Sequence, residues 1–290
     1  MTTATEATTR TLEVPGATLT YDVRPGGTDD APLFLIGSPM AAAGFGSLAG
    51  HFADRTIVTY DPRGSERSTK PDMTSQSTPE EHADDLHRII QEVGGPVDLF
   101  ASSGGAVNAL ALIAAHPEDV RTLVAHEPPL ASILPDADHA KAAARAVGET
   151  YQRNGFGAGM AHFIAVVTHQ GEFPADFAQQ PAPDPAMFGM PAEDDGSRTD
   201  PLLGQNIITC THYEPDFDAL RAASTRIVIA AGAESQGTMA SRGAYAVAER
   251  LGTTVVVFPS DHGGFLGGEY GQMGQPEAFA AKLRQVLEES

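Results

Sequence analysis

The sequence predicts an α/β fold: a mostly parallel, doubly wound sheet with a helical lid inserted after the sixth strand. Short apolar runs bounded by turn residues alternate with helical patterns along most of the 290 residues. Strands separated by helices of this length pair in parallel, with helices on both faces. The alternation stops between residues 129 and 220. We therefore expect a flexible N-terminus over 1–10, a core over 11–128 and 221–290, and a lid over 129–220.

The first part of the core supplies one antiparallel strand and two buried strands. Thr18–Arg24 alternates apolar and polar residues, as an early antiparallel strand does. Pro32–Gly37 and Arg55–Asp61 are almost continuously apolar, which is typical of strands buried on both faces. A short helix over 44–53 fits between them.

The next helix carries clear signals at both ends. Thr78 is placed as the N-cap, Glu81 follows three residues later as in a capping box, and Gly94 ends the helix. The remaining core elements are expected in this order: strand 96–102, helix 104–115, strand 120–127, strand 225–232, helix 239–251, strand 253–260 and helix 276–288. Because such a sheet gathers functional groups at the carboxyl ends of its strands, the site is expected there.

The segment over 129–220 begins with a helical pattern and continues into a passage rich in proline, methionine and acidic residues. An irregular stretch of this length inside a compact domain is usually a lid or a binding loop. The alternative is a plain solvated loop without a role in binding.

Composition limits the classes of partner. The formal net charge of −20 makes nucleic acids and anionic membrane surfaces poor partners. No apolar run is long enough to span a bilayer, and the polar N-terminus lacks the apolar centre of a signal peptide, so a cytoplasmic protein is expected. The single cysteine, Cys210, excludes an internal disulfide or a cysteine metal cluster. A homodimer is compatible with the sequence.

Ser103 is the first candidate catalytic residue. It stands in Ala101-Ser102-Ser103-Gly104-Gly105, where a predicted strand becomes a helix. A nucleophile on a sharp strand-to-helix turn needs small neighbours, and the Gly104 N–H would then point at a developing oxyanion. Two alternatives are close packing of the helix on the sheet and a poor dinucleotide loop. The glycines do not follow the dinucleotide-binding spacing, which disfavours the second.

Two further loops at the same edge of the sheet complete the pattern. His262 lies between aspartate and glycine just after the last predicted strand, where core packing is a poor explanation for it. Ser38 follows the strand over 32–37 and could supply the second oxyanion N–H. No pair of histidines has the spacing of a helical zinc site, so we expect no metal and no organic cofactor.

These segments together resemble the α/β-hydrolase family over nearly the whole chain. "LIGSPM" looks like its oxyanion loop, "YDPRGSERS" like its Asp-x-Arg-Gly segment, "FASSGGAVNAL" like its nucleophile elbow and "FPSDHGGF" like its histidine loop. Three positions depart from the family pattern: Ile36 in place of histidine, Glu66 in place of glycine, and Ala101 in place of the first elbow glycine.

The resemblance leaves two candidates for the acid that orients His262. The family's usual aspartate position, after the strand that follows the lid, holds Ser235 here, and Glu234 is one residue off. Glu127 stands at the end of the strand that precedes the lid, where some family members carry their acid. We favour Glu127 and keep Glu234 as the alternative.

The expected activity is that of a serine hydrolase that cleaves a carboxylic ester or lactone of a hydrophobic small molecule through an acyl-enzyme. Serine at the elbow argues against the dehalogenases and epoxide hydrolases of this fold, which the resemblance associates with aspartate. The alternatives are a cofactor-free perhydrolase or acyltransferase, a carbon–carbon bond hydrolase, and a non-catalytic receptor for a small ligand. Substrate contacts are expected from Gly37, Pro39, Met40, Phe163 and Phe188.

Overall fold

The computed structural model describes residues 6–289, and an eight-stranded sheet runs through them in the order β1-β2-β4-β3-β5-β6-β7-β8. β2 pairs antiparallel with β1 and β4, whereas every other neighbouring pair is parallel. The predicted mostly parallel α/β sheet is therefore confirmed. The strands are β1 (Thr8–Val14), β2 (Ala17–Arg24), β3 (Leu33–Ile36), β4 (Ile57–Asp61), β5 (Val97–Ser102), β6 (Val120–His126), β7 (Arg226–Gly232) and β8 (Val256–Phe258).

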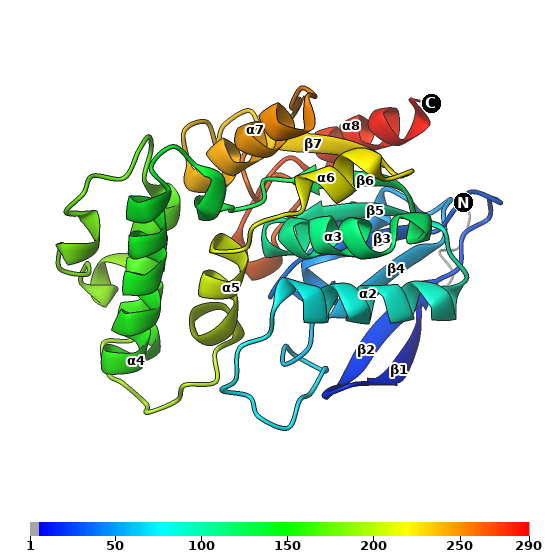
Figure 1. Ribbon diagram of the computed structural model, residues 1–290. Helices are drawn as coiled ribbons and strands as arrows, with labels where there is room; N and C mark the ends of the chain where they lie inside the picture. The colour runs from blue at the N-terminus through cyan, green and yellow to red at the C-terminus, as the bar shows by residue number, and fades with distance from the viewer. Residues whose placement is uncertain (1–5, 290) are drawn as a thin grey trace.

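Helices cover both faces of the sheet (Figure 1). α2, α3, α6 and α7 contribute to the apolar core on one face, and α1 and α8 to the core on the other. The helices are α1 (Gly46–Gly50), α2 (Pro79–Val93), α3 (Gly104–Ala115), α4 (Ala137–Thr168), α5 (Ile207–Thr211), α6 (Phe217–Ala222), α7 (Met239–Leu251) and α8 (Pro276–Glu288).

The buried strands divide their side chains between these two cores. Along β3, Phe34 and Ile36 belong to the core under α2 and α3, while Leu33 and Leu35 belong to the core under α1 and α8. Successive side chains of a strand point to opposite faces, so a strand buried on both faces has to be apolar throughout. This is why the central strands are almost continuous apolar runs in the sequence.

The N-terminal segment differs from the expected flexible stretch over 1–10. Thr8–Arg10 already belong to β1, whose register pairs Thr8 with Val23 of β2. Residues 8–12 of this strand are exposed or half-exposed. A strand at the edge of a sheet can be polar on both faces because its hydrogen bonds, rather than burial, hold it in place. Residues 1–5 lie outside the described part of the chain.

The helix α2 has the predicted capping box. The Thr78 side chain accepts a hydrogen bond from the Glu81 N–H, and the Glu81 carboxylate accepts one from the Thr78 N–H. Gly94 ends the helix in a left-handed conformation, with φ of 84°. The sequence signals therefore gave the correct bounds of this helix.

A largely helical insertion separates β6 from β7 and stands away from the two chain ends (Figure 1). Its longest element, α4, is broken at Gly155, where φ is 83° and an added Cβ would meet the Asp194 side chain. A short 3₁₀ turn, η3 (Ala131–Ile133), precedes α4. Two more, η4 (Phe177–Gln179) and η5 (Pro185–Phe188), follow it. A π-helical turn, η6 (Leu202–Asn206), then leads directly into α5.

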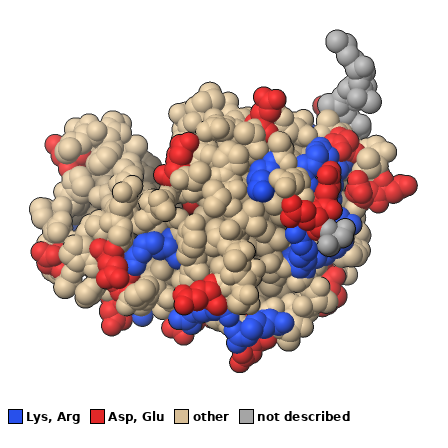
Figure 2. Space-filling view, turned by 90° about the horizontal axis from the view of Figure 1, so that it is seen from above, with Lys and Arg blue, Asp and Glu red and all other residues tan. Residues whose placement is uncertain are grey.

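One face of the molecule shows how charge is distributed over it. Figure 2 shows Asp and Glu side chains scattered around the rim of one face, whose middle is largely uncharged. Within residues 6–289, no helix combines the length and the apolar character needed to cross a membrane.

Candidate active site

Ser103 lies on a strained turn between β5 and α3. Its backbone has φ of 58° and ψ of −127°, a conformation that side-chain-bearing residues rarely adopt. The Ser103 N–H donates to the carbonyl of His126 at 2.9 Å, so the neighbouring strand end holds the turn in place. Ser103 lines a cavity at the carboxyl edge of the sheet.

The two glycines after Ser103 are required by close backbone packing. A Cβ on Gly104 would lie 2.4 Å from the carbonyl oxygen of Ser38, and a Cβ on Gly105 would lie 2.8 Å from the Cα of Gly37. The loop after β3 therefore packs directly on the first turn of α3. Close packing and a strained serine, which were alternatives in the sequence, occur together here.

The structure brings His262 and Glu127 into direct contact. His262 Nδ1 lies 2.6 Å from Glu127 Oε2. The Glu127 side chain is fully buried, whereas that of His262 is 44% exposed and lines the same cavity as Ser103. In the described residues no hydrogen bond joins the Ser103 hydroxyl to the His262 ring; contacts of this kind commonly tighten only when a substrate binds.

Glu127 is held by groups from β7 and the turn after it. Its Oε1 accepts hydrogen bonds from the Gly232 N–H at 2.9 Å and from the Ser235 hydroxyl. Burial by itself would raise the pKa of the Glu127 carboxyl, but hydrogen bonds from His262 and Ser235 lower it to about 2. The carboxylate is therefore ionised at neutral pH and can stabilise a protonated His262.

The alternative acid, Glu234, lies elsewhere. Its side chain is exposed at the rim of the cavity, and its Oε1 accepts from Gln275 Nε2 at 3.4 Å. The adjacent Ser235 points inward to Glu127. The position at which the family usually has its acid therefore holds a residue that supports the glutamate of the neighbouring strand.

Two backbone N–H groups lie where an oxyanion site is expected. Neither the Ser38 N–H nor the Gly104 N–H donates a hydrogen bond to any part of the chain that the structure describes. The Gly104 N–H also stands at the N-terminus of α3, where the helix dipole favours negative charge. Both residues line the cavity beside Ser103.

The cavity has a volume of about 440 Å³ and lies between the sheet edge and the insertion. Of the five residues expected to contact substrate, Phe163 lines it, whereas Gly37, Pro39, Met40 and Phe188 are not among its lining residues. Gly37 packs against the start of α3, and Met40 packs against the core under α1 and α8. Phe188 ends η5, which has no buried residue. The apolar wall is instead formed by Phe163, Val167, Leu202, Ile207 and Met239.

Two cavity residues, Asn206 and Cys210, were missed in the sequence. Both come from the end of the insertion: Asn206 contacts Ser38 in the loop after β3, and the Cys210 sulfur lies beside Asn206 and Gly104. Burial raises the pKa of the Cys210 thiol to about 12, so it is a neutral hydrogen-bond donor and not a thiolate. The only signal in the sequence was the presence of polar residues within an otherwise apolar helical stretch.

Two groups of side chains have a spacing that could suit a cation. His126, Glu127 and His262 form one, but both Glu127 oxygens already accept hydrogen bonds there. The other, His87, His116 and Asp119, lies where α2 and α3 end, at the far end of α3 from Ser103. In that group the centroids of the two imidazole rings are stacked 3.9 Å apart, and His87 Nδ1 already lies 2.6 Å from Asp119 Oδ2.

Comparisons with known proteins agree with this architecture. The model of the alpha/beta hydrolase fold family matches residues 33–266. The uncharacterized hydrolase YraK of Bacillus subtilis (strain 168) is 31% identical over 261 residues, which cover 88% of this chain and 89% of that protein.

Solved structures of esterases share the fold. A thermophilic esterase from Thermogutta terrifontis, with malate bound, has a TM-score of 0.65 at 20% identity, covering 97% of this chain and 98% of that one. The carboxylesterase CesB (YbfK) from Bacillus subtilis has a TM-score of 0.64 at 14% identity, covering 98% and 93%. Because the family model spans most of the core and the curated relative aligns over nearly the full length, the chain belongs to the α/β-hydrolase family.

Proposed function

We propose that this protein is a serine hydrolase that cleaves a carboxylic ester or lactone of a largely apolar small molecule through an acyl-enzyme. The observation that carries the proposal is the short contact between His262 Nδ1 and Glu127 Oε2, 2.6 Å, in a cavity that Ser103 also lines. The esterases among the solved structures of the same fold support ester substrates in particular.

The first half of the reaction forms the acyl-enzyme. His262 Nε2 takes the proton of the Ser103 hydroxyl as Oγ attacks the carbonyl carbon, and the oxyanion that forms accepts hydrogen bonds from the Ser38 and Gly104 N–H groups. His262 then gives its proton to the leaving alkoxide, and the tetrahedral intermediate collapses to an ester on Ser103. Glu127 holds the imidazole by Nδ1 and stabilises its protonated form.

The second half releases the acid. His262 takes a proton from a water molecule, and the resulting hydroxide attacks the acyl carbon at the same oxyanion site. When this intermediate collapses, the bond to Ser103 Oγ breaks and the proton returns from His262 to that oxygen. No redox step and no co-substrate other than water enter the cycle.

Labelling with a fluorophosphonate, followed by intact mass measurement, tests this assignment. We expect one adduct on the wild type, none on Ser103→Ala, slow labelling of Glu127→Gln and nearly normal labelling of Glu234→Gln. A folded wild type that forms no adduct would contradict the serine-hydrolase proposal, and ligand binding without turnover would then be the better account. Faster labelling of Glu127→Gln than of Glu234→Gln would assign the acid to Glu234.

A further inference from the structure

Asn206 is a buried polar side chain that the insertion contributes to the cavity. It is the last residue of the π-helical turn η6 and is only 6% exposed. Its Oδ1 accepts hydrogen bonds from the Ser38 hydroxyl at 3.1 Å and from the Cys210 thiol at 3.0 Å. Ser38 also carries one of the two proposed oxyanion N–H groups, so Asn206 lies beside the oxyanion site.

In the structure the carbonyl oxygen of the amide faces both groups. The Ser38 hydroxyl and the neutral Cys210 thiol donate to it there. The Nδ2 group, by contrast, has no acceptor among residues 6–289, although Asn206 lines the cavity with Ser103 and Gly104. Nδ2 is not among the fully enclosed polar atoms that lack a partner, so it remains accessible and can donate to a ligand in the cavity.

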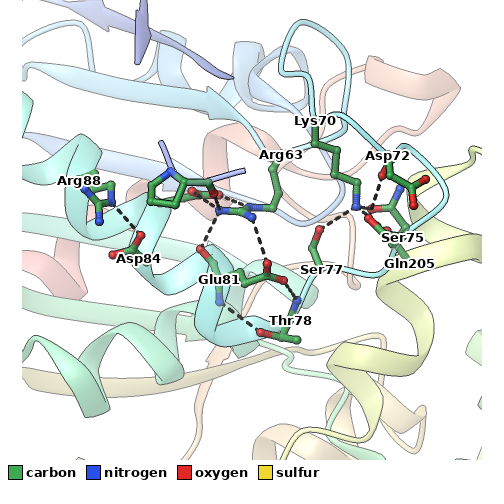
Figure 3. A network of polar contacts seen from close by, with 12 residues as sticks. Arg63, Lys70, Asp72, Ser75, Ser77, Thr78, Glu81, Asp84, Arg88 and Gln205 are labelled. Atoms are coloured by element: carbon green, nitrogen blue, oxygen red, sulfur yellow. Dashed lines mark hydrogen bonds and ion pairs between the residues drawn. The ribbon is translucent and has the colours of Figure 1, made fainter. Parts of the chain in front are cut away.

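The turn that carries Asn206 is clamped to the core through the preceding residue. Gln205 Oε1 accepts from Lys70 Nζ at 2.8 Å, and Gln205 Nε2 donates to the Met73 carbonyl at 2.8 Å. Figure 3 shows Lys70 also reaching Ser75 and Ser77 of the same core loop. π-Helical turns are rare and concentrate at functional sites. Asn206 is thereby held in place from the core on one side and from Ser38 on the other.

The charges around the cavity define the kind of group that this N–H would recognise. Glu234 and Asp261 also line the cavity and would repel a carboxylate on the substrate. The remaining wall is mostly apolar, and Asn206 brings no charge. A neutral oxygen acceptor, such as a ketone, ether or hydroxyl oxygen, is not repelled by these carboxylates, is compatible with the apolar wall and can accept from the uncharged amide.

We propose that Asn206 is a specificity-determining residue whose Nδ2 donates to a second, uncharged oxygen of the substrate next to the scissile ester. The preferred substrates are then keto, alkoxy or hydroxy esters rather than simple alkyl esters. This inference rests on the proposed esterase function of the same site. It adds to that function the class of substrate and the residue that selects it.

Matched pairs of esters test the proposal. Ethyl acetoacetate and ethyl isovalerate differ by an oxygen in place of a methyl group, as ethyl methoxyacetate and ethyl butyrate differ by an oxygen in place of a methylene. The measured quantity is the ratio of kcat/KM within each pair. Comparing this ratio between wild type and variant removes the intrinsic difference in reactivity between the two esters.

Two variants change the donor in different ways. Asn206→Asp keeps an acceptor for Ser38 and Cys210 but loses the amide N–H, and Asn206→Leu removes both polar groups at similar size. We expect the ratio to fall about tenfold or more in each variant for at least one pair, the loss of one buried hydrogen bond. Thr168→Val is the matched control, because the Thr168 hydroxyl already donates to the Ile164 carbonyl at 2.7 Å, and its ratio is expected to stay at the wild-type value.

The outcomes separate this inference from the function on which it rests. A wild type that hydrolyses simple alkyl esters, with ratios that neither Asn206 variant changes, would overturn the inference alone. So would fluorophosphonate labelling of Ser103 without turnover of either oxygen-bearing ester. Failure of the labelling itself would overturn both. Circular dichroism melting curves establish that each variant is folded. If one variant does not fold, the other still tests the inference.

Discussion

Glu127 and Ser235, just after the ends of neighbouring strands β6 and β7, would together take the role that the proposed function gives to the acid of the triad. The glutamate starts from the end of β6, with φ of 51°, and its longer side chain reaches His262. Ser235, after β7, donates to Glu127 instead of contacting the histidine. Both carboxylates were candidates in the sequence, and only the direction of the side chains separates Glu127, which contacts His262, from Glu234, which contacts Gln275.

Replacing Glu127 tests this arrangement by kinetics. In Glu127→Gln the orienting carboxylate becomes an amide, so we expect kcat for p-nitrophenyl butyrate to fall by about 10³-fold or more. Glu234→Gln is the matched control and should stay within about twofold, as surface changes away from reacting atoms usually do. An equal loss in both variants would contradict the assignment of roles.

Because the imidazole of His126 is buried, we expect the stability of the protein to depend on pH, whether or not the protein is catalytically active. Burial lowers the pKa of His126 to about 4 from 6.5. Below pH 6.5 the unfolded chain takes up a proton that the native chain refuses until about pH 4, so stability falls as the pH falls through this window. The slope from one such group is at most about 1.4 kcal/mol per pH unit.

The substitution His126→Phe should remove the part of the slope that is due to His126. The part due to His82, whose pKa burial lowers to about 3, should remain. The ring packs against Phe100, Phe258 and Phe279, so a phenyl group matches its apolar surroundings and loses only the 3.3 Å contact between Nδ1 and the Ser102 hydroxyl. Urea unfolding between pH 6.5 and 5 measures it, because in this range the Glu127 carboxyl, with an ordinary pKa of 4.5, is still mostly ionised in the unfolded chain. An unchanged slope in the variant would show that His126 is not the group responsible.

At the scale of elements, the junction between the loop after β3 and the start of α3 is the most tightly packed part of the site. Gly105→Ala would bring a Cβ within 2.8 Å of the Gly37 backbone, which cannot rotate away. We expect a loss of about 1–3 kcal/mol of stability, measured by chemical unfolding. Gly50→Ala at the end of α1 has open space around its Cβ and serves as the control. Equal stability of the two variants would contradict the packing argument.

Some elements were predictable from local signals, and others were not. The bounds of α3, α7 and α8 agree with the expected helices, because glycine, proline and the apolar pattern fix them locally. β1 was missed because a polar edge strand has no apolar period to detect. The contact between Ser38 and Asn206 joins residues 168 positions apart, and no local pattern encodes such a pairing.

At the scale of the whole molecule, the net charge of −20 should influence which substrates reach the site. A field of this sign repels anions over about 10 Å at 0.1 M salt and over less at higher salt. The kcat/KM ratio of diethyl succinate to its anionic monoethyl ester should therefore fall as salt is added. Glu234→Gln, at the rim of the cavity, should lower the same ratio at low salt. A ratio independent of salt would show that the global charge has no part in selection.

The central claim is that catalysis passes through an ester on Ser103, and trapping that intermediate tests it most directly. Wild-type protein mixed with p-nitrophenyl butyrate, quenched in acid within the first turnover and digested, should carry one butyryl group on the peptide that contains Ser103. The group should disappear on longer incubation as water releases it. Turnover of the ester with no acyl group on this peptide, or with the group on Cys210 instead, would contradict the account.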